Sequence, residues 1–104
     1  MPAPDLTLVR EFKQRAEAAL PGRIARVVLY GSRARGDARA DSDWDIAVFT
    51  PGDPTPSEWS ELGDISFELS TETGLPIHLI VLPQRRADDG SAISVSVAAD
   101  GIAA

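Results

Sequence analysis

The apolar positions of this chain repeat with two different spacings. Between residues 6 and 20 they recur every three or four residues, which predicts a helix that Asp5 caps and Pro21-Gly22 ends. Residues 23–30 and 44–49 are runs of largely apolar residues, and each predicts a strand. The first half of the chain is therefore expected to fold as helix, strand, connecting stretch and strand.

The pattern after residue 50 predicts one more helix and one more strand. Ser57 is expected to cap a helix that ends at Gly74, after a loop that contains three prolines. The apolar stripe of this helix consists of Trp59, Leu62, Ile65 and Leu69. Residues 76–82 are apolar apart from His78, and they predict a third strand that Pro83 ends.

The last residues admit two interpretations. Ile93 and Val97 are four residues apart, which predicts a short helix that Gly101 closes in a left-handed conformation. Val95 alternates with both of them, so a strand is the alternative. Together the elements indicate one domain over residues 1–104 of the α/β (α+β) class, in which helices pack on one side of a small mixed three-stranded sheet.

Composition narrows the class of protein. The 104 residues are 43% hydrophobic and 25% charged, which is ordinary for a globular domain with one modest core. There is no cysteine, which suits a reducing compartment, and no apolar run approaches the about 20 residues of a membrane span. The first residues lack the basic and apolar regions of a signal peptide. We therefore expect a cytoplasmic protein without a membrane partner.

Charge is distributed unevenly along the chain. Residues 1–50 hold eight Lys and Arg against seven Asp and Glu, whereas residues 51–104 hold two against nine. A duplex-binding protein would present a broad basic surface, so direct binding of nucleic acid is not expected. The acidic second half could face a basic protein partner or serve solubility alone.

The stretch between the first two predicted strands carries the candidate chemistry. Gly31 allows close approach of the backbone to a ligand, and Ser32 offers a hydroxyl and an amide to a phosphate oxygen. Asp43 and Asp45 are two residues apart, so on a strand their side chains share one face, while Trp44 points into the core. Two carboxylates on one side can share a divalent cation. These residues predict a site for a metal-bound nucleoside triphosphate.

Three arginines in this stretch favour a small anionic ligand. Arg33, Arg35 and Arg39 lie between the Gly-Ser pair and the two aspartates. A role in an exposed loop explains each of them equally well when it is taken singly.

The same residues resemble a known family. Gly31-Ser32, ten intervening residues and Asp43-Trp44-Asp45 match the GS-x10-DxD signature of the DNA polymerase β-like nucleotidyltransferase superfamily. The string GSRARGDARADSDWDIAVF is similar to that of the minimal nucleotidyltransferases, the MNT group. Proteins of this group often act as antitoxins beside HEPN-domain toxins.

The resemblance implies an activity and a role for each matching residue. Gly31 and Ser32 would hold the β- and γ-phosphates of ATP, and Arg35, in the family-like run Ala34-Arg35-Gly36, is the arginine best placed to assist. Asp43 and Asp45 would bind Mg2+, or Mn2+. The reaction implied is transfer of AMP to a tyrosine hydroxyl of a HEPN-type toxin, with pyrophosphate leaving.

One position departs from the family pattern. The family places a third acidic residue in the third strand, and the matching residue here is His78. A neutral imidazole suits Mg2+ poorly and Mn2+ or Zn2+ better, but it can accept a proton near neutral pH. Two interpretations stay open, namely a catalytic His78 and a degenerate antitoxin that acts by binding alone. Glu68 and Glu72 on the preceding helix are not expected to reach the site.

Overall fold

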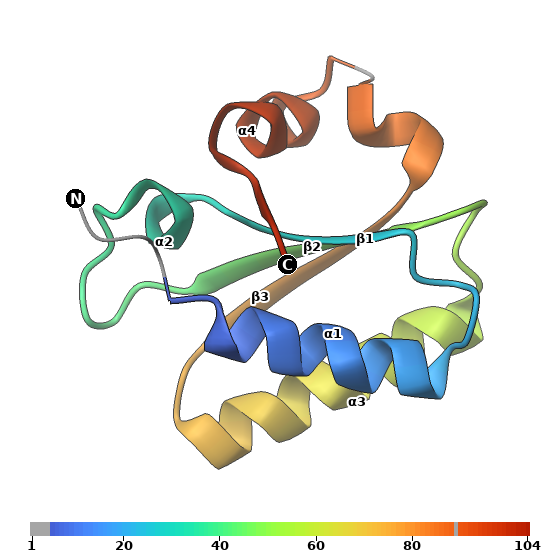
Figure 1. The fold of residues 1–104 in the computed structure, drawn as a ribbon, viewed down its shortest axis with the longest axis horizontal. Coiled ribbons are helices and arrows are strands. Elements are labelled where there is room, and N and C mark those ends of the chain that lie inside the picture. Colours follow the sequence, from blue (N-terminus) through green and yellow to red (C-terminus); the bar gives the residue numbers. More distant parts are fainter. Residues whose placement is uncertain (1–4, 89) are drawn as a thin grey trace.

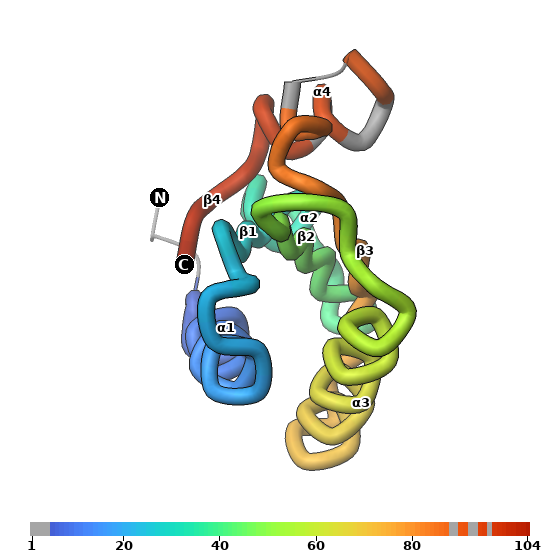
Figure 2. Tube along the Cα trace, turned by 90° about the vertical axis from the view of Figure 1, so that its right-hand side faces the viewer, coloured from blue at the N-terminus to red at the C-terminus, as the bar shows by residue number. Residues whose placement is uncertain are grey.

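A four-stranded sheet in the order β3-β2-β1-β4 separates two layers of helix (Figure 1). The computed structural model describes residues 5–88 and 90–104. The strands are β1 (Arg26–Tyr30), β2 (Trp44–Thr50), β3 (Ile77–Pro83) and β4 (Ile102–Ala103). The helices are α1 (Thr7–Ala19), α2 (Ser32–Arg35), α3 (Pro56–Thr73), the 3-10 helix η1 (Gln84–Asp88) and α4 (Ala92–Asp100). Figures 1 and 2 place α1 and α3 on one face of the sheet, with η1 and α4 on the other.

The α/β class is confirmed, but the expected three-stranded sheet with helices on one side is wrong in two respects. The end of the chain adds β4, which pairs antiparallel with β1. In addition, η1 and α4 cover the second face of the sheet, where they pack on a small cluster that includes Val28, Phe49 and Val97. A two-residue strand has no periodicity of its own, so the sequence pattern carried no signal for it.

Gly101 explains how the chain returns to the sheet. Its backbone is extended, with φ −64° and ψ 135°, so the expected left-handed cap is wrong. A Cβ at this position would overlap the carbonyl oxygen of Val97 and lie 2.8 Å from Cγ1 of Val28. The glycine is therefore required by close packing between α4 and β1. Because the chain stays extended beyond α4, Ile102 reaches Leu29 as its pairing partner.

Alternation along the strands divides the core in two. The face toward α1 and α3 carries a large cluster in which Val9, Phe12, Leu29 and Ile46 are 0% exposed. Trp44 packs partly buried against the same cluster, so the expectation that Trp44 faces the core is confirmed. The opposite face of β1 carries Val28 and Tyr30 in the smaller cluster beneath α4.

Several predicted boundaries shift by one to three residues. The first helix begins at Thr7, and the carboxylate of Asp5 accepts hydrogen bonds from the backbone N and Oγ1 of that residue at 2.9 and 2.6 Å. The first strand begins at Arg26 rather than at residue 23. The terminal helix is confirmed over the alternative strand; Val97 is buried in it, and the side chain of Ile93 lies outside the described part of the chain.

The start of α3 is capped by a different residue from the one expected. Thr55, not Ser57, accepts a hydrogen bond from the backbone N of Glu58, and the Glu58 carboxylate accepts one in return from the backbone N of Thr55. The sequence Thr-Pro-Ser-Glu over residues 55–58 is a capping box with proline at the first helical position. In the ranges 5–88 and 90–104, no helix combines the length and the apolar character needed to cross a membrane.

Candidate functional site

The site is built on a row of residues that crosses three strands. In the antiparallel pair β1–β2, Tyr30 faces Asp45, and in the parallel pair β2–β3, Asp45 faces His78. Neighbours in register share one face of a sheet, here the face on which α4 packs. The fold therefore brings together two predicted site residues that are 33 positions apart in the sequence.

Asp45 and His78 are in direct contact. Nδ1 of His78 lies 3.1 Å from Oδ1 of Asp45, which is hydrogen-bonding distance. The side chain of His78 is 59% exposed, whereas that of Asp45 is 24% exposed. A half-enclosed carboxylate that orients an open imidazole is an arrangement suited to handling a proton at the surface.

Gly31 lies directly against the Asp45 carboxylate. Its φ of 75° and ψ of −156° define a backbone conformation that only glycine adopts readily. A Cβ at this position would overlap Oδ2 of Asp45 and lie 3.2 Å from its Cγ. Both the conformation and the close approach to Asp45 thus require glycine, and the expected approach of this backbone to a ligand stays a prediction.

Ser32 begins a single turn of helix instead of a simple tight turn. This turn, α2, ends at Gly36 in the left-handed conformation, with φ 86°. The carbonyl oxygen of Ser32 accepts hydrogen bonds from the amides of Gly36 and Asp37, at 2.9 and 3.1 Å. These hydrogen bonds close the turn on itself, and Ser32 follows directly on Gly31, which packs against Asp45.

Asp43 occupies a different environment from Asp45. The strand β2 begins at Trp44, whose amide donates to the carbonyl oxygen of Pro76 at 2.8 Å, so Asp43 precedes the strand. Asp43 is therefore an exposed loop residue directly before β2, and the face that it is expected to share with Asp45 stays a prediction.

The carboxylates of Asp43 and Asp45 suit a cation that also binds a nucleotide. They suit a cation held by protein side chains alone less well. Across the described residues, no group of three or more His, Cys, Asp and Glu side chains is close enough to hold a metal ion. Magnesium in nucleotide sites usually takes only one or two carboxylates, because phosphate oxygens and water complete its shell. The close packing of the Asp45 carboxylate on Gly31 also brings its oxygens to the chain segment predicted to meet phosphate.

The three arginines of the loop separate into different roles. The guanidinium of Arg33 lies over the ring of Trp44, 4.8 Å from its centroid, and donates to the carbonyl oxygens of Ala40 and Ser42 at 3.2 and 3.0 Å. Arg33 therefore braces the loop against the strand. The exposed Arg39 contributes its backbone amide, which donates to Oγ of Ser42 at 2.8 Å.

Arg35 is held by two carboxylates. It donates to Asp37 at 3.1 Å and to Asp100, at the end of α4, at 3.0 Å. Its hydrogen bonds to Asp37 and then to Asp100 raise the pKa of the Arg35 guanidinium. The side chain is 45% exposed, so the guanidinium stays open to solvent on the loop.

The residue that sequence reasoning missed is Tyr30. It is 5% exposed, and within the described chain its buried hydroxyl has no hydrogen-bond partner. Burial, with a smaller effect of the Asp45 charge, raises the pKa of Tyr30 to about 12. Its position directly before Gly31 was the available signal. The acids Glu68 and Glu72, as expected, lie elsewhere and face Arg15 on α1.

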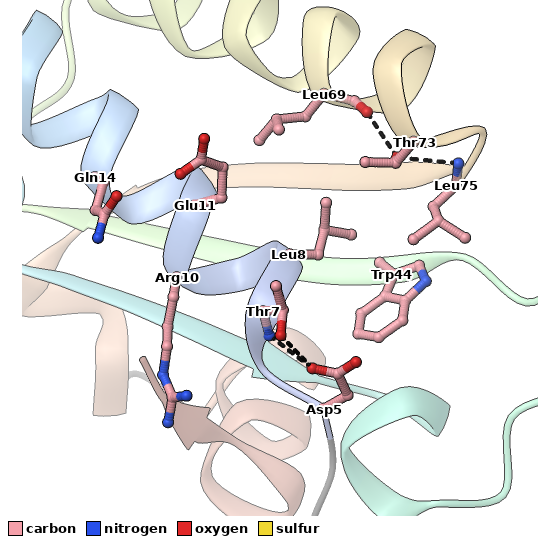
Figure 3. Close-up of a pocket in the computed structure, with 10 residues that line it drawn as sticks. All are labelled: Asp5, Thr7, Leu8, Arg10, Glu11, Gln14, Trp44, Leu69, Thr73 and Leu75. Carbon is pink, nitrogen blue, oxygen red and sulfur yellow. Dashed lines mark hydrogen bonds between the residues drawn. The ribbon is translucent and has the colours of Figure 1, made fainter.

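A cleft of about 630 Å³ opens on the opposite face of the sheet, between α1 and the end of α3 (Figure 3). Leu8, Leu69, Leu75 and Trp44 form its apolar lining. None of the candidate residues Gly31, Asp43, Asp45 and His78 lines it. The cleft and the candidate site are thus separated by the sheet, and Trp44 is the link between them because it follows Asp43 and precedes Asp45.

Comparison with known proteins matches most of the chain. The nucleotidyltransferase domain family matches residues 8–97. A relative from Methanocaldococcus jannaschii, provisionally named a protein adenylyltransferase, is 30% identical over 73% of this chain and 77% of its own length. These two matches confirm the predicted resemblance to nucleotidyltransferases.

Solved structures share the fold. A nucleotidyltransferase structure from Sulfolobus solfataricus superposes with a TM-score of 0.65 at 22% identity, over 94% of this chain and 77% of that one. A toxin–antitoxin structure with AMP-PNP gives a TM-score of 0.60 at 16% identity, over 89% and 69% of the two chains. A minimal nucleotidyltransferase structure gives 0.54 at 25% identity, over 90% and 93%. The polymerase β-like, MNT-type fold is therefore confirmed.

Proposed function

This chain belongs to the nucleotidyltransferase domain family, and we propose that it is an antitoxin that transfers AMP from ATP to a hydroxyl group of a HEPN-type toxin. The observation that carries the proposal is the contact between Asp45 and His78 beside Gly31. This contact places the carboxylate of Asp45 and the imidazole of His78, which can accept a proton, next to the segment that carries the family-like Gly31-Ser32 pair. The provisional name of the Methanocaldococcus relative supports the class of reaction.

Each residue has a distinct role in the proposed reaction. Gly31 and Ser32 approach the β- and γ-phosphates, and Arg35 adds positive charge next to them. Asp43 and Asp45 would hold Mg2+ or Mn2+, which when bound neutralises charge on the attacking and leaving oxygens. The acceptor oxygen forms a bond to the α-phosphorus, the bond from that phosphorus to the bridging oxygen breaks, and pyrophosphate leaves.

His78 would accept the proton of the attacking hydroxyl. When Asp45 is ionised it can only accept a hydrogen bond, so the proton of the neutral imidazole belongs on Nδ1. Nε2 is then left with a free electron pair and can take up the proton. Asp45 thus acts on His78 as a positioning residue in addition to its proposed contact with the cation.

The experiment that tests the proposal uses labelled ATP, a divalent cation and a HEPN-type protein. We expect label on the partner, and in Asp43→Asn/Asp45→Asn we expect it to fall at least about 100-fold, as when groups that stabilise transition-state charge are removed. Titration calorimetry of the same variant should show no metal-dependent binding of ATP. Unchanged binding in the variant would show that the site assignment is wrong.

The partner is proposed from charge and from the structural neighbours. Residues 51–104 carry two basic against nine acidic side chains, which suits a basic surface. Several neighbours are structures of a toxin–antitoxin pair, among them a mutant of MntA–HpeT with a TM-score of 0.62. A complex with a HEPN-type protein should form at low salt and weaken toward 1 M salt, where the Debye length is about 3 Å. The absence of a complex in size-exclusion runs at low salt would argue against this partner.

A second candidate function is neutralisation by binding alone. The observation that favours it is the pair of exposed aromatic side chains on α3, since Phe67 is 73% and Trp59 is 43% exposed. On this alternative, Asp43→Asn/Asp45→Asn would still neutralise the toxin although it binds no nucleotide. On the enzymatic function, the same variant would lose neutralisation together with transfer.

A further inference from the structure

The outward face of α3 has an unusual composition for a helix that packs on a sheet. Leu62, Ile65 and Leu69 are buried and attach the helix to the core. On the outer side Trp59, Gly63 and Phe67 follow one another at intervals of four, so they form one stripe along the helix. Phe67 is 73% exposed and Trp59 is 43% exposed. Figures 1 and 2 show α3 at the outside of the molecule, on the side of the sheet away from α4.

Gly63 has no reason within the fold to be glycine. It lies in the middle of an 18-residue helix, it is not among the glycines with positive φ, and a Cβ built on it meets nothing within 4 Å. Glycine lowers helix stability relative to alanine, so it is unfavourable for the free chain. The position instead provides a gap between two aromatic side chains through which another helix backbone could approach closely.

The charges beside this stripe have one sign. The helix α3 holds five Asp and Glu and no Lys or Arg. Glu58 is bound by Arg23 at its start, and Glu72 is paired with Arg15 near its end. Glu61 and Asp64, in the middle of the helix, are exposed. At about 100° per residue Asp64 lies on the flank of the helix next to Phe67, whereas Glu61 lies about 160° around the helix from Gly63.

A hollow beside Phe67 extends the stripe toward α1. It has a volume of about 340 Å³ and is lined by Phe67, Thr71, Arg15, Glu68 and Glu72. An exposed aromatic ring next to a small hollow can receive an apolar side chain, while the two carboxylates of this hollow lie against Arg15.

We propose that the outer face of α3 binds a basic amphipathic helix of a partner protein. The small, apolar side of that helix packs over Gly63 between Trp59 and Phe67, and its Lys or Arg side chains face Asp64. A second copy of this chain is a poor occupant, because the outer face of its α3 would bring a second Asp64 against the first. The inference rests on the proposed function for the identity of the partner, and it adds the surface that holds the partner while the site acts on it.

The test measures binding without nucleotide, so its outcome does not depend on AMP transfer. The probe is a fluorescent synthetic peptide helix with alanine and leucine along one side and lysine on the flanks, and its counterpart carries glutamate in place of lysine. Fluorescence anisotropy should show binding of the lysine peptide only. Gly63→Leu should weaken this binding about tenfold, equivalent to about 1.4 kcal/mol, because its side chain fills the gap.

Matched variants separate the surface from general effects of charge and stability. Gly63→Ala should raise the melting temperature of the free chain and yet weaken binding, which a purely structural role cannot produce. Asp64→Lys should weaken binding more than Glu17→Lys, an equal charge change at an exposed position of α1. Phe67→Ser should weaken binding, whereas Val95→Ser, at a side chain 59% exposed on α4, should not.

Three outcomes would overturn the inference. They are equal binding of the two peptides, binding of the lysine peptide that Gly63→Leu and Phe67→Ser leave unchanged, and a self-associated chain that Phe67→Ser converts to monomer without any binding of peptide. If the peptide results hold and no AMP is transferred, the surface stands and the proposed catalytic function falls. If AMP is transferred and the peptide does not bind, the reverse applies.

Discussion

The two ends of the sheet hold similar charged groups and use them differently. At the end where β1 starts and β2 finishes, Glu58 is bound by Arg23 at 2.6 Å, its side chain is 9% exposed, and it also closes the capping box with Thr55. At the other end, Asp45 contacts one imidazole at 3.1 Å, and that imidazole is 59% exposed. At the first end the carboxylate is surrounded by the protein's own donors, whereas at the second it faces an open side chain.

This difference indicates which carboxylate is available to a ligand. The hydrogen bond from Arg23, followed by that from the Thr55 backbone, lowers the pKa of Glu58 to about 2. Those interactions serve the fold, because they attach the loop before β1 to the start of α3. Asp45 instead contacts the imidazole of His78, and that imidazole is open to solvent, where an external substrate could reach it.

The largest expected effect comes from Gly31→Ala. The added Cβ is strained at φ 75° and collides with Oδ2 of Asp45, so we expect a loss of about 3 kcal/mol in the free energy of unfolding and loss of ATP binding. Gly22→Ala is the matched control, because Gly22 has φ 77° and nothing within 4 Å of its Cβ position. Urea denaturation of both variants separates backbone strain from the collision; equal losses would show that the contact with Asp45 is unimportant.

At the opposite end, Glu58→Gln should cost less and depend on pH. The pKa of Glu58 is lowered from 4.5 to about 2, so its charge stabilises the folded state above about pH 4.5, and this stabilisation is lost as pH falls toward 2. We expect the variant to be about 1–2 kcal/mol less stable at pH 7, with solvent screening at the partly exposed Arg23 taken into account.

Urea denaturation of wild type and Glu58→Gln across this pH range measures the effect. The difference between the two proteins should shrink steadily below pH 4.5. A difference that is the same at pH 7 and pH 2.5 would show that the capping geometry, and not the charge, is responsible.

His78→Asp tests the open end of the sheet directly. A third carboxylate beside Asp45 should lower the free energy of unfolding by about 1 kcal/mol without metal, because like charges repel. With Mg2+ the variant should regain this stability and transfer AMP faster than wild type, which should do relatively better with Mn2+.

His78→Asn is the control for His78→Asp, since it removes the imidazole without adding charge. Transfer rates with each cation, together with melting temperatures with and without metal, measure the outcome. Equal and robust transfer by wild type and His78→Asp in Mg2+ would show that His78 is not at the catalytic position. Inactivity of both would favour the antitoxin that acts by binding alone.

The smallest expected effect is that of Asp100→Asn. Its pair with Arg35 is partly exposed, so its removal should leave the free energy of unfolding nearly unchanged. Removing this negative charge should nevertheless tighten ATP binding about two- to threefold, because Arg35 loses a competitor for its charge. Titration calorimetry at low salt checks this, with Glu17→Gln as a remote control. Unchanged affinity would mean that Arg35 does not assist the phosphates.

The sequence by itself determined the local parts of this protein. Helical spacing between residues 6 and 20 and the apolar runs of the three long strands were sufficient to predict these elements, because such patterns depend on neighbours in the chain. The spacing of Gly31 and Asp45 likewise indicated a nucleotidyltransferase, and the family match agrees. The Thr-Pro-Ser-Glu capping box was equally local and could have been recognised.

Only the tertiary structure decided what distant segments do to one another. The contact of His78 with Asp45 depends on the parallel register of β2 and β3, which the intervening helix α3 sets and no local pattern contains. The need for glycine at position 101 arises partly from Val28, which lies on another element, and Ile102 next to it pairs with β1. Arg35 donates a hydrogen bond to Asp100, 65 positions away in the sequence, for the same reason. Many contacts between distant segments together fix the position of each side chain, and these contacts form only when the chain folds.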